Sequence, residues 1–371
     1  MNRSRVVLWA ITAVAIGLSA SLPPAGAADA DAQEMKAIVE KAVAFLRKQQ
    51  AADGSFSAKT TGPGVTGIVV AGLLRNGISP DDPMVARAMA FLEKNVKKDG
   101  GIYDKALANY TTSVALMAFH EANAGGKYDK LIKNASLFLK GLQSGADPKD
   151  PRSGGVGYDD KSRPDLSNTQ FFVDALLASG VPKDDPAILN ALKFINRCQN
   201  LPGPEGNDQP FAKKARPEDI GGFTYTPIDP DDSKHKTPDG GLRSLGAMTY
   251  GGLKSFLYAG VSKEDPRVKA AIKWMRAHYT LDENPGMGQS GLYYYYHTFA
   301  KAMAALGEDP FEDEMKVKHE WRKELLAAIK KRQKEDGSFV NATDRAFGEA
   351  DPTLATAFAI LTLSHTKTAK K

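Results

Sequence analysis

The strongest constraint on the fold is an internal repeat. The segment AVAFLRKQQAADGSF at 42–56 is echoed by LAAIKKRQKEDGSF at 326–339, and four weaker copies lie between them. Each copy has the pattern of an amphipathic helix, a glycine-rich turn with an aromatic residue, and a second helix. Strand signals are scarce. The repeat therefore predicts an all-α chain of six helix pairs, whose helices end at glycine or at an Asp-Pro pair.

The second helix of each pair is far more apolar than the first, as in TGIVVAGLL at 66–74 and LATAFAILTL at 354–363. Such a helix must be buried behind its amphipathic partner. Six pairs form either an open solenoid, which needs polar end repeats, or a closed ring. Because the first and last turns are the best-matched copies, we expect an (α/α)6 toroid with an apolar inner ring and an amphipathic outer ring. Insertions at 144–168 and 200–242 should lie at one end of this ring.

The apolar helices share one hydroxyl-bearing position when they are aligned on their small residues. We expect this hydroxyl to bond the preceding turn rather than a ligand, since binding sites seldom repeat one residue in every unit. The neighbouring positions vary, and ligand specificity should lie there. This hydroxyl series consists of Thr66, Thr112, Thr169, Thr249, Tyr296 and Thr356.

The N-terminus has the pattern of a secretory signal peptide. Arg3 and Arg5 precede an uncharged apolar run at 6–22, and small residues follow at 25–27. The alternative is an uncleaved anchor, but the apolar run is short for a membrane span, which needs about 20 residues. We expect a signal peptide at 1–27 and one toroid domain at 28–371. The mature protein should be periplasmic or extracellular, without a stable membrane anchor.

Charge and cysteine content exclude several classes. The formal net charge is +5, and it falls by two when Arg3 and Arg5 are removed. So small a surplus, dispersed along the chain, gives no nucleic-acid site. Cys198 is the only cysteine, so the exported chain has no internal disulfide and depends on its core for stability.

The turns resemble the degenerate QW repeats of the terpenoid cyclase and protein prenyltransferase α/α toroid superfamily, which includes squalene–hopene cyclases. In that motif an aromatic-aliphatic helix is followed by Gln, then Gly and an aromatic residue. The resemblance covers essentially the whole mature chain and implies a toroid with a central cavity for an isoprenoid-like ligand. It is carried by Phe45, Leu46, Gln50, Gly54 and Phe56 in the first copy and by Ile329, Gln333, Gly337 and Phe339 in the last.

The acid of the cyclases is a D-x-D-D run at the start of an inner helix. Residues 229–232 spell DPDD, but they belong to a polar loop well before Thr249. The stretch that matches in register is DLSN at 165–168, where Ser167 replaces the proton-donating middle Asp and Asn168 replaces the Asp that follows it. Neither side chain can protonate an alkene, so the acid motif is not retained in register. The remaining catalytic candidates are Asp165, Asp229, Asp231, Asp232 and Arg243.

The prenyltransferase branch of the superfamily holds a zinc ion with an Asp-x-Cys pair and a distant His. Here Asn196 stands two residues before Cys198, and the six His residues show no ligand spacing. We therefore expect neither a metal site nor a cofactor.

Aromatic and polar residues gather on the apolar helices and suit either an isoprenoid or a sugar chain. We expect a small-molecule or lipid-like ligand in the central cavity. Two alternatives remain: a polysaccharide lyase or glycosidase on the same toroid, and a non-catalytic interaction scaffold. The sequence therefore leaves undecided whether the protein is an enzyme. The expected cavity residues are Tyr110, Asn168, Gln170, Arg243, Tyr250, Tyr293, Tyr296 and His297.

Overall fold

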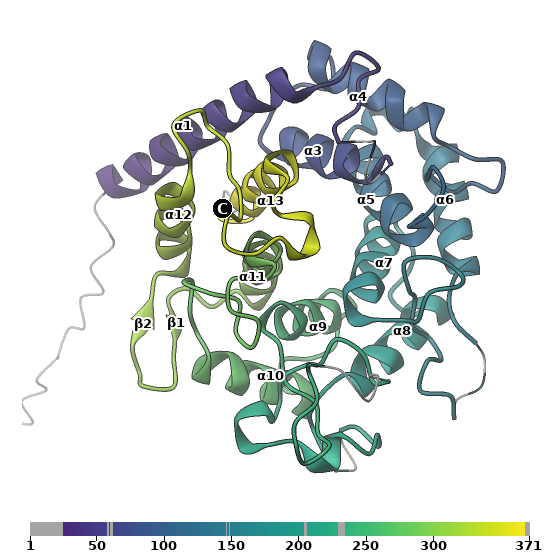
Figure 1. Ribbon diagram of the computed structural model, residues 1–371, viewed down its shortest axis with the longest axis vertical. Coiled ribbons are helices and arrows are strands. Elements are labelled where there is room, and N and C mark those ends of the chain that lie inside the picture. Colours follow the sequence, from purple (N-terminus) through teal and green to yellow (C-terminus); the bar gives the residue numbers. More distant parts are fainter. Residues whose placement is uncertain are drawn as a thin grey trace, which may run out of the picture.

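Two concentric rings of helices surround the centre of the molecule (Figure 1). The computed structural model describes residues 25–367 except 58, 60–61, 146, 148, 204–205 and 229–233. The inner ring consists of α3 (Gly64–Arg75), α5 (Ala108–Glu121), α7 (Leu166–Ala178), α9 (Gly246–Tyr258), α11 (Leu292–Leu306) and α13 (Pro352–Ser364). The outer ring consists of α1 (Ala25–Gln49), α4 (Pro83–Lys94), α6 (Asp129–Gly141), α8 (Pro186–Arg197), α10 (Pro266–Ala277) and α12 (Trp321–Arg332).

The inner ring is closed. Each inner helix packs against the next one along the chain, and α13 packs against α3. On the outside, α1 contacts both α12 and α13, which joins the two ends of the described chain. The predicted all-α (α/α)6 toroid, with its apolar inner and amphipathic outer ring, is confirmed.

The Asp-Pro pairs mark helix starts, which corrects the interpretation of these pairs as helix ends. Asp82, Asp185 and Asp265 each accept a hydrogen bond from a backbone N–H in the first turn of α4, α8 and α10, and the proline that follows is the first helical residue. Asp351 does the same for α13. Proline fits this position because its missing N–H would have no partner there.

A glutamine in four of the turns joins neighbouring outer helices. In the first turn, Gln50 Nε2 donates to Gly54 O at 3.0 Å within its own turn and to Met84 O of α4 at 2.8 Å. Gln143 and Gln199 make the equivalent pairs of bonds. Gln333 donates to Ile38 O of α1 at 2.9 Å, so the repeat contact also closes the ring.

The hydroxyl series holds the same turns against the inner helices. Five backbone N–H groups, one from each turn, donate to a threonine hydroxyl at 2.9–3.1 Å. The sixth member, Tyr296, donates instead to the carbonyl of Leu281. The expected structural role of this series is therefore confirmed. The five bonds run from Phe56 to Thr66, Ile102 to Thr112, Val156 to Thr169, Phe223 to Thr249 and Phe339 to Thr356.

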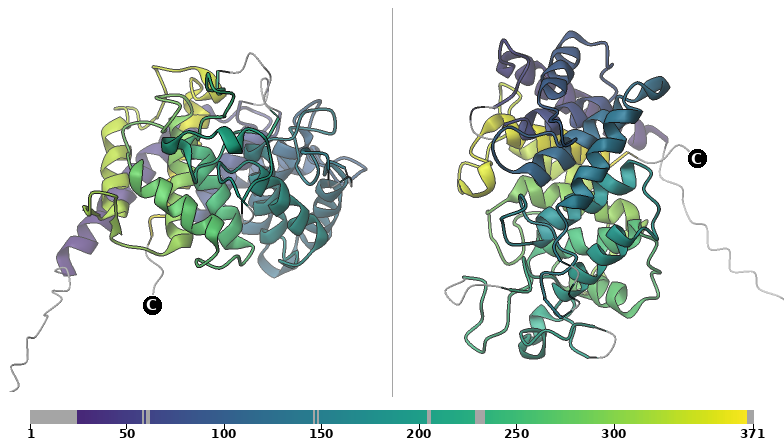
Figure 2. Two further views of the ribbon diagram at one scale, coloured as in Figure 1. Left: turned by 90° about the horizontal axis from the view of Figure 1, so that it is seen from below. Right: turned by 90° about the vertical axis from the view of Figure 1, so that its right-hand side faces the viewer.

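The two insertions meet at the N-terminal ends of the inner helices. Leu166 N, at the start of α7, donates to Tyr225 O at 2.8 Å, and Thr226 Oγ1 donates to Pro164 O at 3.2 Å. The described residues between α8 and α9 lie at one end of the ring in side view (Figure 2) and include η2 (Ala212–Lys214) and η3 (Pro217–Asp219). This end carries the candidate site.

The remaining elements are short. A two-stranded antiparallel hairpin of β1 (Phe311–Glu312) and β2 (Lys318–His319) precedes α12. The 3₁₀ turns η1 (Ala124–Gly126) and η4 (Ala346–Gly348) lie before α6 and α13. Within the described residues, none of the helices combines the length and apolar character needed to cross a membrane.

Candidate functional site

A pocket of about 230 Å³ lies at the N-terminal ends of α7, α9 and α11. Its apolar wall comes from Leu245 and Met248 at the start of α9, from Met287 in the turn before α11, and from Phe347 in η4. Hydroxyl, amide and imidazole groups of Ser167, Tyr225, His235, Asn284 and Tyr294 supply the polar wall. The described lining residues include no carboxylate.

Two of the polar groups are already engaged elsewhere. The Asn284 side chain accepts from Ala247 N at 3.0 Å and donates to Ser290 O at 3.0 Å. The Tyr225 phenol hydrogen-bonds the carboxyl group of Asp165. Ser167 and Tyr294, in contrast, face each other across the pocket wall with their hydroxyl oxygens 2.9 Å apart.

Asp165 lies behind this wall and caps α7. Its two oxygens accept from the backbone N–H and the side-chain amide of Asn168, both at 2.8 Å. Only 2% of the residue is exposed, and burial raises the pKa of the carboxyl group to about 6 despite these bonds. The carboxyl group thus holds the start of α7 and does not line the pocket.

Only one tyrosine of the four-residue run on α11 reaches the pocket. The phenols of Tyr293, Tyr295 and Tyr296 hydrogen-bond carbonyls in the turns around α11. Successive residues on a helix point about 100° apart, so the four side chains face four different directions. Tyr294 is the one that faces the pocket, where its phenol meets Ser167 and accepts from Gln170 Nε2 at 3.1 Å.

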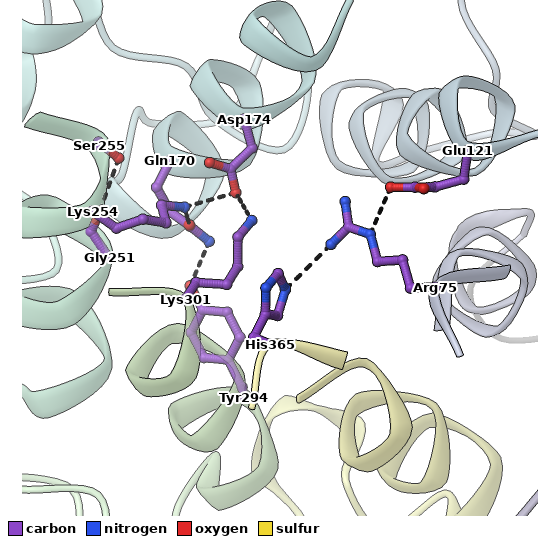
Figure 3. A network of polar contacts seen from close by, with 10 residues as sticks. All are labelled: Arg75, Glu121, Gln170, Asp174, Gly251, Lys254, Ser255, Tyr294, Lys301 and His365. Atoms are coloured by element: carbon purple, nitrogen blue, oxygen red, sulfur yellow. Dashed lines mark hydrogen bonds and ion pairs between the residues drawn. The ribbon is translucent and has the colours of Figure 1, made fainter. Parts of the chain in front are cut away.

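A charged cluster occupies the interior of the inner ring (Figure 3). Lys254 of α9 and Lys301 of α11 both donate to Asp174 Oδ2 of α7, at 2.7 and 2.5 Å. Each of the three residues is at most 6% exposed. Burial lowers the pKa of Lys254 to about 7, while the two ammonium groups hold the pKa of Asp174 below its usual range.

A second polar group lies beside this cluster, where α3, α5 and α13 end. Arg75 pairs with Glu121 at 2.7 Å and contacts His365 Nε2 at 3.2 Å (Figure 3). His297 is 1% exposed, and its ring centre lies 5.7 Å from that of His365. Burial and the nearby ammonium group of Lys301 push the pKa of His297 well below its ordinary value, so its ring is neutral.

The structure distributes the expected cavity residues among several places. Gln170 bridges the pocket wall and the charged cluster, and Asn168 is held by Asp165. Tyr110 is half-buried and packs edge-on against Phe171. The other five expected residues lie away from the pocket. Arg243 is exposed, Tyr250 is buried against Tyr295 and Phe299, Tyr293 and Tyr296 bond outlying turns, and His297 lies near α13.

Of the other catalytic candidates, Arg243 does not line the pocket. Asp229, Asp231 and Asp232 lie outside the described residues. Sequence reasoning missed Tyr294 as a site residue, and it missed the cluster of Asp174, Lys254 and Lys301. A signal for the cluster existed, because each of its members is the only Asp, Glu, Lys or Arg in its inner helix. An isolated charge in an apolar helix must find a partner when that helix is buried.

A metal centre requires several convergent ligands. Among the described residues, no group of three or more His, Cys, Asp or Glu side chains is placed to hold a metal ion. Cys198 is fully buried, and burial raises the pKa of its thiol well above the ordinary value.

Comparison with known proteins gives similarity in structure only. No protein-family model and no curated protein matches the sequence. The type II terpene cyclase MstE from Scytonema, in its apo form, superposes with a TM-score of 0.53 at 13% identity, covering 90% of this chain and 97% of that one. A possible member of the GH105 family from Salmonella enterica serovar Paratyphi A gives a TM-score of 0.53 at 12% identity, covering 96% of this chain and 98% of that one.

These similarities span nearly the whole chain. At such low identity they establish the fold and leave the chemistry to the site itself. The α/α toroid fold that the resemblance to the terpenoid cyclase superfamily implies is confirmed.

Proposed function

We propose that the protein binds one end of an apolar, isoprenoid-like ligand in the pocket between α7, α9 and α11. The observation that carries the proposal is the composition of the pocket wall. Leu245, Met248, Met287 and Phe347 surround the space, and a few hydroxyl, amide and imidazole groups border it. Ligand sites of this kind are mostly apolar, with a small number of polar groups that fix orientation.

The pocket volume limits how much of a ligand is enclosed. At about 230 Å³ the pocket is smaller than the roughly 300–1,000 Å³ of most small-molecule sites, so it encloses only one end of an isoprenoid chain. A longer chain would leave its remainder outside the described pocket.

Binding without cyclisation fits the polar groups on the wall. Protonating an alkene needs an unusually strong acid in a dry cavity. Ser167 occupies the register of the missing acid, and its hydroxyl cannot serve in that role. Asp165 uses its oxygens to hold Asn168 and Tyr225.

The carbohydrate alternative needs more carboxyl groups than the described wall supplies. Glycosidases place two carboxyl groups on either side of the scissile bond, about 5–9.5 Å apart. The similarity to the GH105-family structure supports the toroid that such an enzyme would use, while the wall composition favours an apolar ligand.

The experiment combines recovery of the ligand that co-purifies with the protein and a variant whose pocket is filled by a larger side chain. Protein purified from its natural compartment is analysed by native mass spectrometry, and a separate sample is extracted with organic solvent to identify the released ligand. Geraniol binding to the protein is measured by calorimetry. In Met287→Trp, a large ring enters the pocket, and we expect geraniol affinity to fall at least tenfold, which is about 1.4 kcal/mol.

The matched control makes the same change at an exposed site. Met315 is 83% exposed in the β1–β2 hairpin, so Met315→Trp should bind geraniol as the wild type does. Recovery of no apolar ligand, together with binding to a polysaccharide array, would overturn the proposal in favour of the carbohydrate alternative.

The site of action proposed here is outside the cytoplasm, on the strength of the signal-peptide pattern at 1–27. The test is the intact mass of the protein from the cell envelope. A mass that corresponds to a chain beginning at Ala28 supports export with cleavage. The mass of the full-length chain, found in the cytosolic fraction, contradicts it.

A further inference from the structure

A continuous line of hydrogen bonds runs from the pocket wall to the charged cluster. Ser167 Oγ lies 2.9 Å from the Tyr294 phenol, and that phenol accepts from Gln170 Nε2 at 3.1 Å. On its other side, Gln170 Oε1 accepts from Lys254 Nζ, which also donates to Asp174 at 2.7 Å. Figure 3 shows the inner part of this line, from Tyr294 to Lys301.

Lys254 fixes the direction in which Gln170 points. The two ends of an amide side chain have nearly the same shape, so their orientation follows from their partners. An ammonium group has three donors and no acceptor. Lys254 is fully buried and shares a single carboxylate with Lys301, so it needs the Gln170 oxygen as an additional acceptor. The Gln170 NH₂ group must then face Tyr294.

This direction leaves one hydroxyl hydrogen for the pocket. The Ser167 and Tyr294 hydroxyls together have two hydrogens. Because Gln170 donates to the phenol oxygen, neither hydrogen is used on Gln170. One of them joins the two hydroxyls to each other, whichever of the two donates. The other remains, and both hydroxyls line the pocket.

We infer that the pocket selects ligands that carry a hydrogen-bond acceptor oxygen, such as a carbonyl, and that Lys254 sets this preference by orienting Gln170. The inference rests on the proposed function and adds the polar chemistry of the ligand. Ser167 and Tyr294 contact the ligand. Gln170 and Lys254 are positioning residues, since they act only through Tyr294.

Replacing Gln170 by glutamate reverses the direction of donation along the hydrogen bonds between Gln170, Tyr294 and Ser167. In Gln170→Glu both oxygens accept, one from Lys254 and one from Tyr294. The phenol hydrogen then points to Glu, the Ser167 hydrogen points to the phenol, and only acceptor lone pairs remain for the pocket. The added negative charge balances the two lysines that share Asp174, so the variant should fold.

The experiment compares three ten-carbon probes with the full-length protein. Geranial is an aldehyde and only accepts, geraniol accepts and donates, and myrcene is a hydrocarbon that does neither. We expect the wild type to bind geranial about tenfold more tightly than myrcene, the effect of one well-placed hydrogen bond. In Gln170→Glu geranial should fall to the level of myrcene, while geraniol keeps its affinity.

Two further measurements support the affinities. The C=O stretch of bound geranial should shift to lower wavenumber in the wild type, and this shift should vanish in Gln170→Glu. If thermal melting shows that Gln170→Glu does not fold, the double variant Ser167→Ala/Tyr294→Phe replaces it. That variant removes both hydroxyls and should bind geranial no better than myrcene.

The outcomes separate this inference from the proposed function. If all three probes bind the wild type equally and Met287→Trp abolishes their binding, the pocket is a ligand site but acceptor selection is wrong. An unchanged ratio of geranial to geraniol in Gln170→Glu likewise overturns the inference. If none of the probes binds the wild type, the proposed function fails and the inference fails with it.

Discussion

Lys254 and Lys301 donate to the same carboxylate oxygen, Oδ2 of Asp174, from two different inner helices. The three side chains are at most 4% exposed, so the ions lie inside the toroid and not at its surface. Burying two cations beside one anion is favourable only when further acceptors satisfy the remaining donors, and Gln170 Oε1 is such an acceptor for Lys254. The centre of the ring is therefore organised by charge as well as by apolar packing.

Removing the shared anion should be strongly destabilising. Asp174→Asn leaves two buried ammonium groups without a counterion, and breaking a buried pair in this way costs about 3–5 kcal/mol. Urea denaturation followed by circular dichroism measures the change in unfolding free energy.

The control is the same substitution at an accessible ion pair. Asp185 caps α8 and pairs with Lys140 at 2.6 Å, with side-chain exposures of 18% and 29%. Asparagine keeps the cap, so Asp185→Asn should lose about 1 kcal/mol or less. Equal losses in the two variants would contradict the role assigned to Asp174.

The hydroxyl series should contribute to stability through the turns that it holds. Thr249→Val keeps the side-chain shape but removes the acceptor of the Phe223 N–H, and Phe223 is fully buried. An unsatisfied buried donor costs about 1–3 kcal/mol.

Thr362→Val provides the comparison for that loss. Thr362 is equally buried, but its hydroxyl only donates to the Phe358 carbonyl of its own helix, so the substitution leaves no donor unpaired. We expect a loss below about 1 kcal/mol. Chemical denaturation of both variants tests the difference, and a larger loss in Thr362→Val would refute it.

Ring closure should depend on a glycine contact. Gly337 has φ +89°, and a Cβ atom there would lie 2.3 Å from Lys41 O of α1. Gly77 has nearly the same φ of +87° but has no atom within 4 Å of the position of a Cβ. Both alanine variants incur the backbone cost, about 1–2 kcal/mol, while only Gly337→Ala also forces α1 away from the turn.

Thermal melting of this pair isolates the contact. Gly337→Ala should melt several degrees below Gly77→Ala, since about 1 kcal/mol shifts the midpoint of a large domain by about 2–4 °C. Coincident melting curves would show that the contact between the last turn and α1 does not contribute to closure.

Stability should depend on pH through Asp165. Burial raises the pKa of its carboxyl group from 3.8 to about 6, so between these values the folded chain binds the proton more tightly than the unfolded chain. Its contribution to stability is complete below pH 4 and is lost as pH rises through 6. The loss amounts to about 3 kcal/mol.

Asp165→Asn keeps a good cap and does not titrate. The unfolding free energy of the variant, relative to the wild type, should therefore rise between pH 4 and 6 and stay level above pH 7. Urea denaturation at each pH measures this difference. A difference that does not change with pH would contradict the raised pKa of Asp165.

The sequence by itself determined the repeat and, through it, the ring. The spacing of apolar residues fixes which side of each helix is buried, and the turn motif recurs with the same contacts, as Gln50 and Gln333 show. The threonines of the hydroxyl series could be assigned a structural role because one residue type at one register has one local partner in every unit.

Only the tertiary structure decided which side chains meet inside the ring. Whether Tyr293 or Tyr294 faces the pocket depends on the rotation of α11 about its axis, which packing against α9 and α13 fixes. The partners of Lys254 lie on α7, 80 and 84 residues away in the chain. Local sequence patterns do not predict contacts between residues so far apart in the sequence. The pocket needs two insertions and three helix ends at once, so its shape is a property of the closed ring.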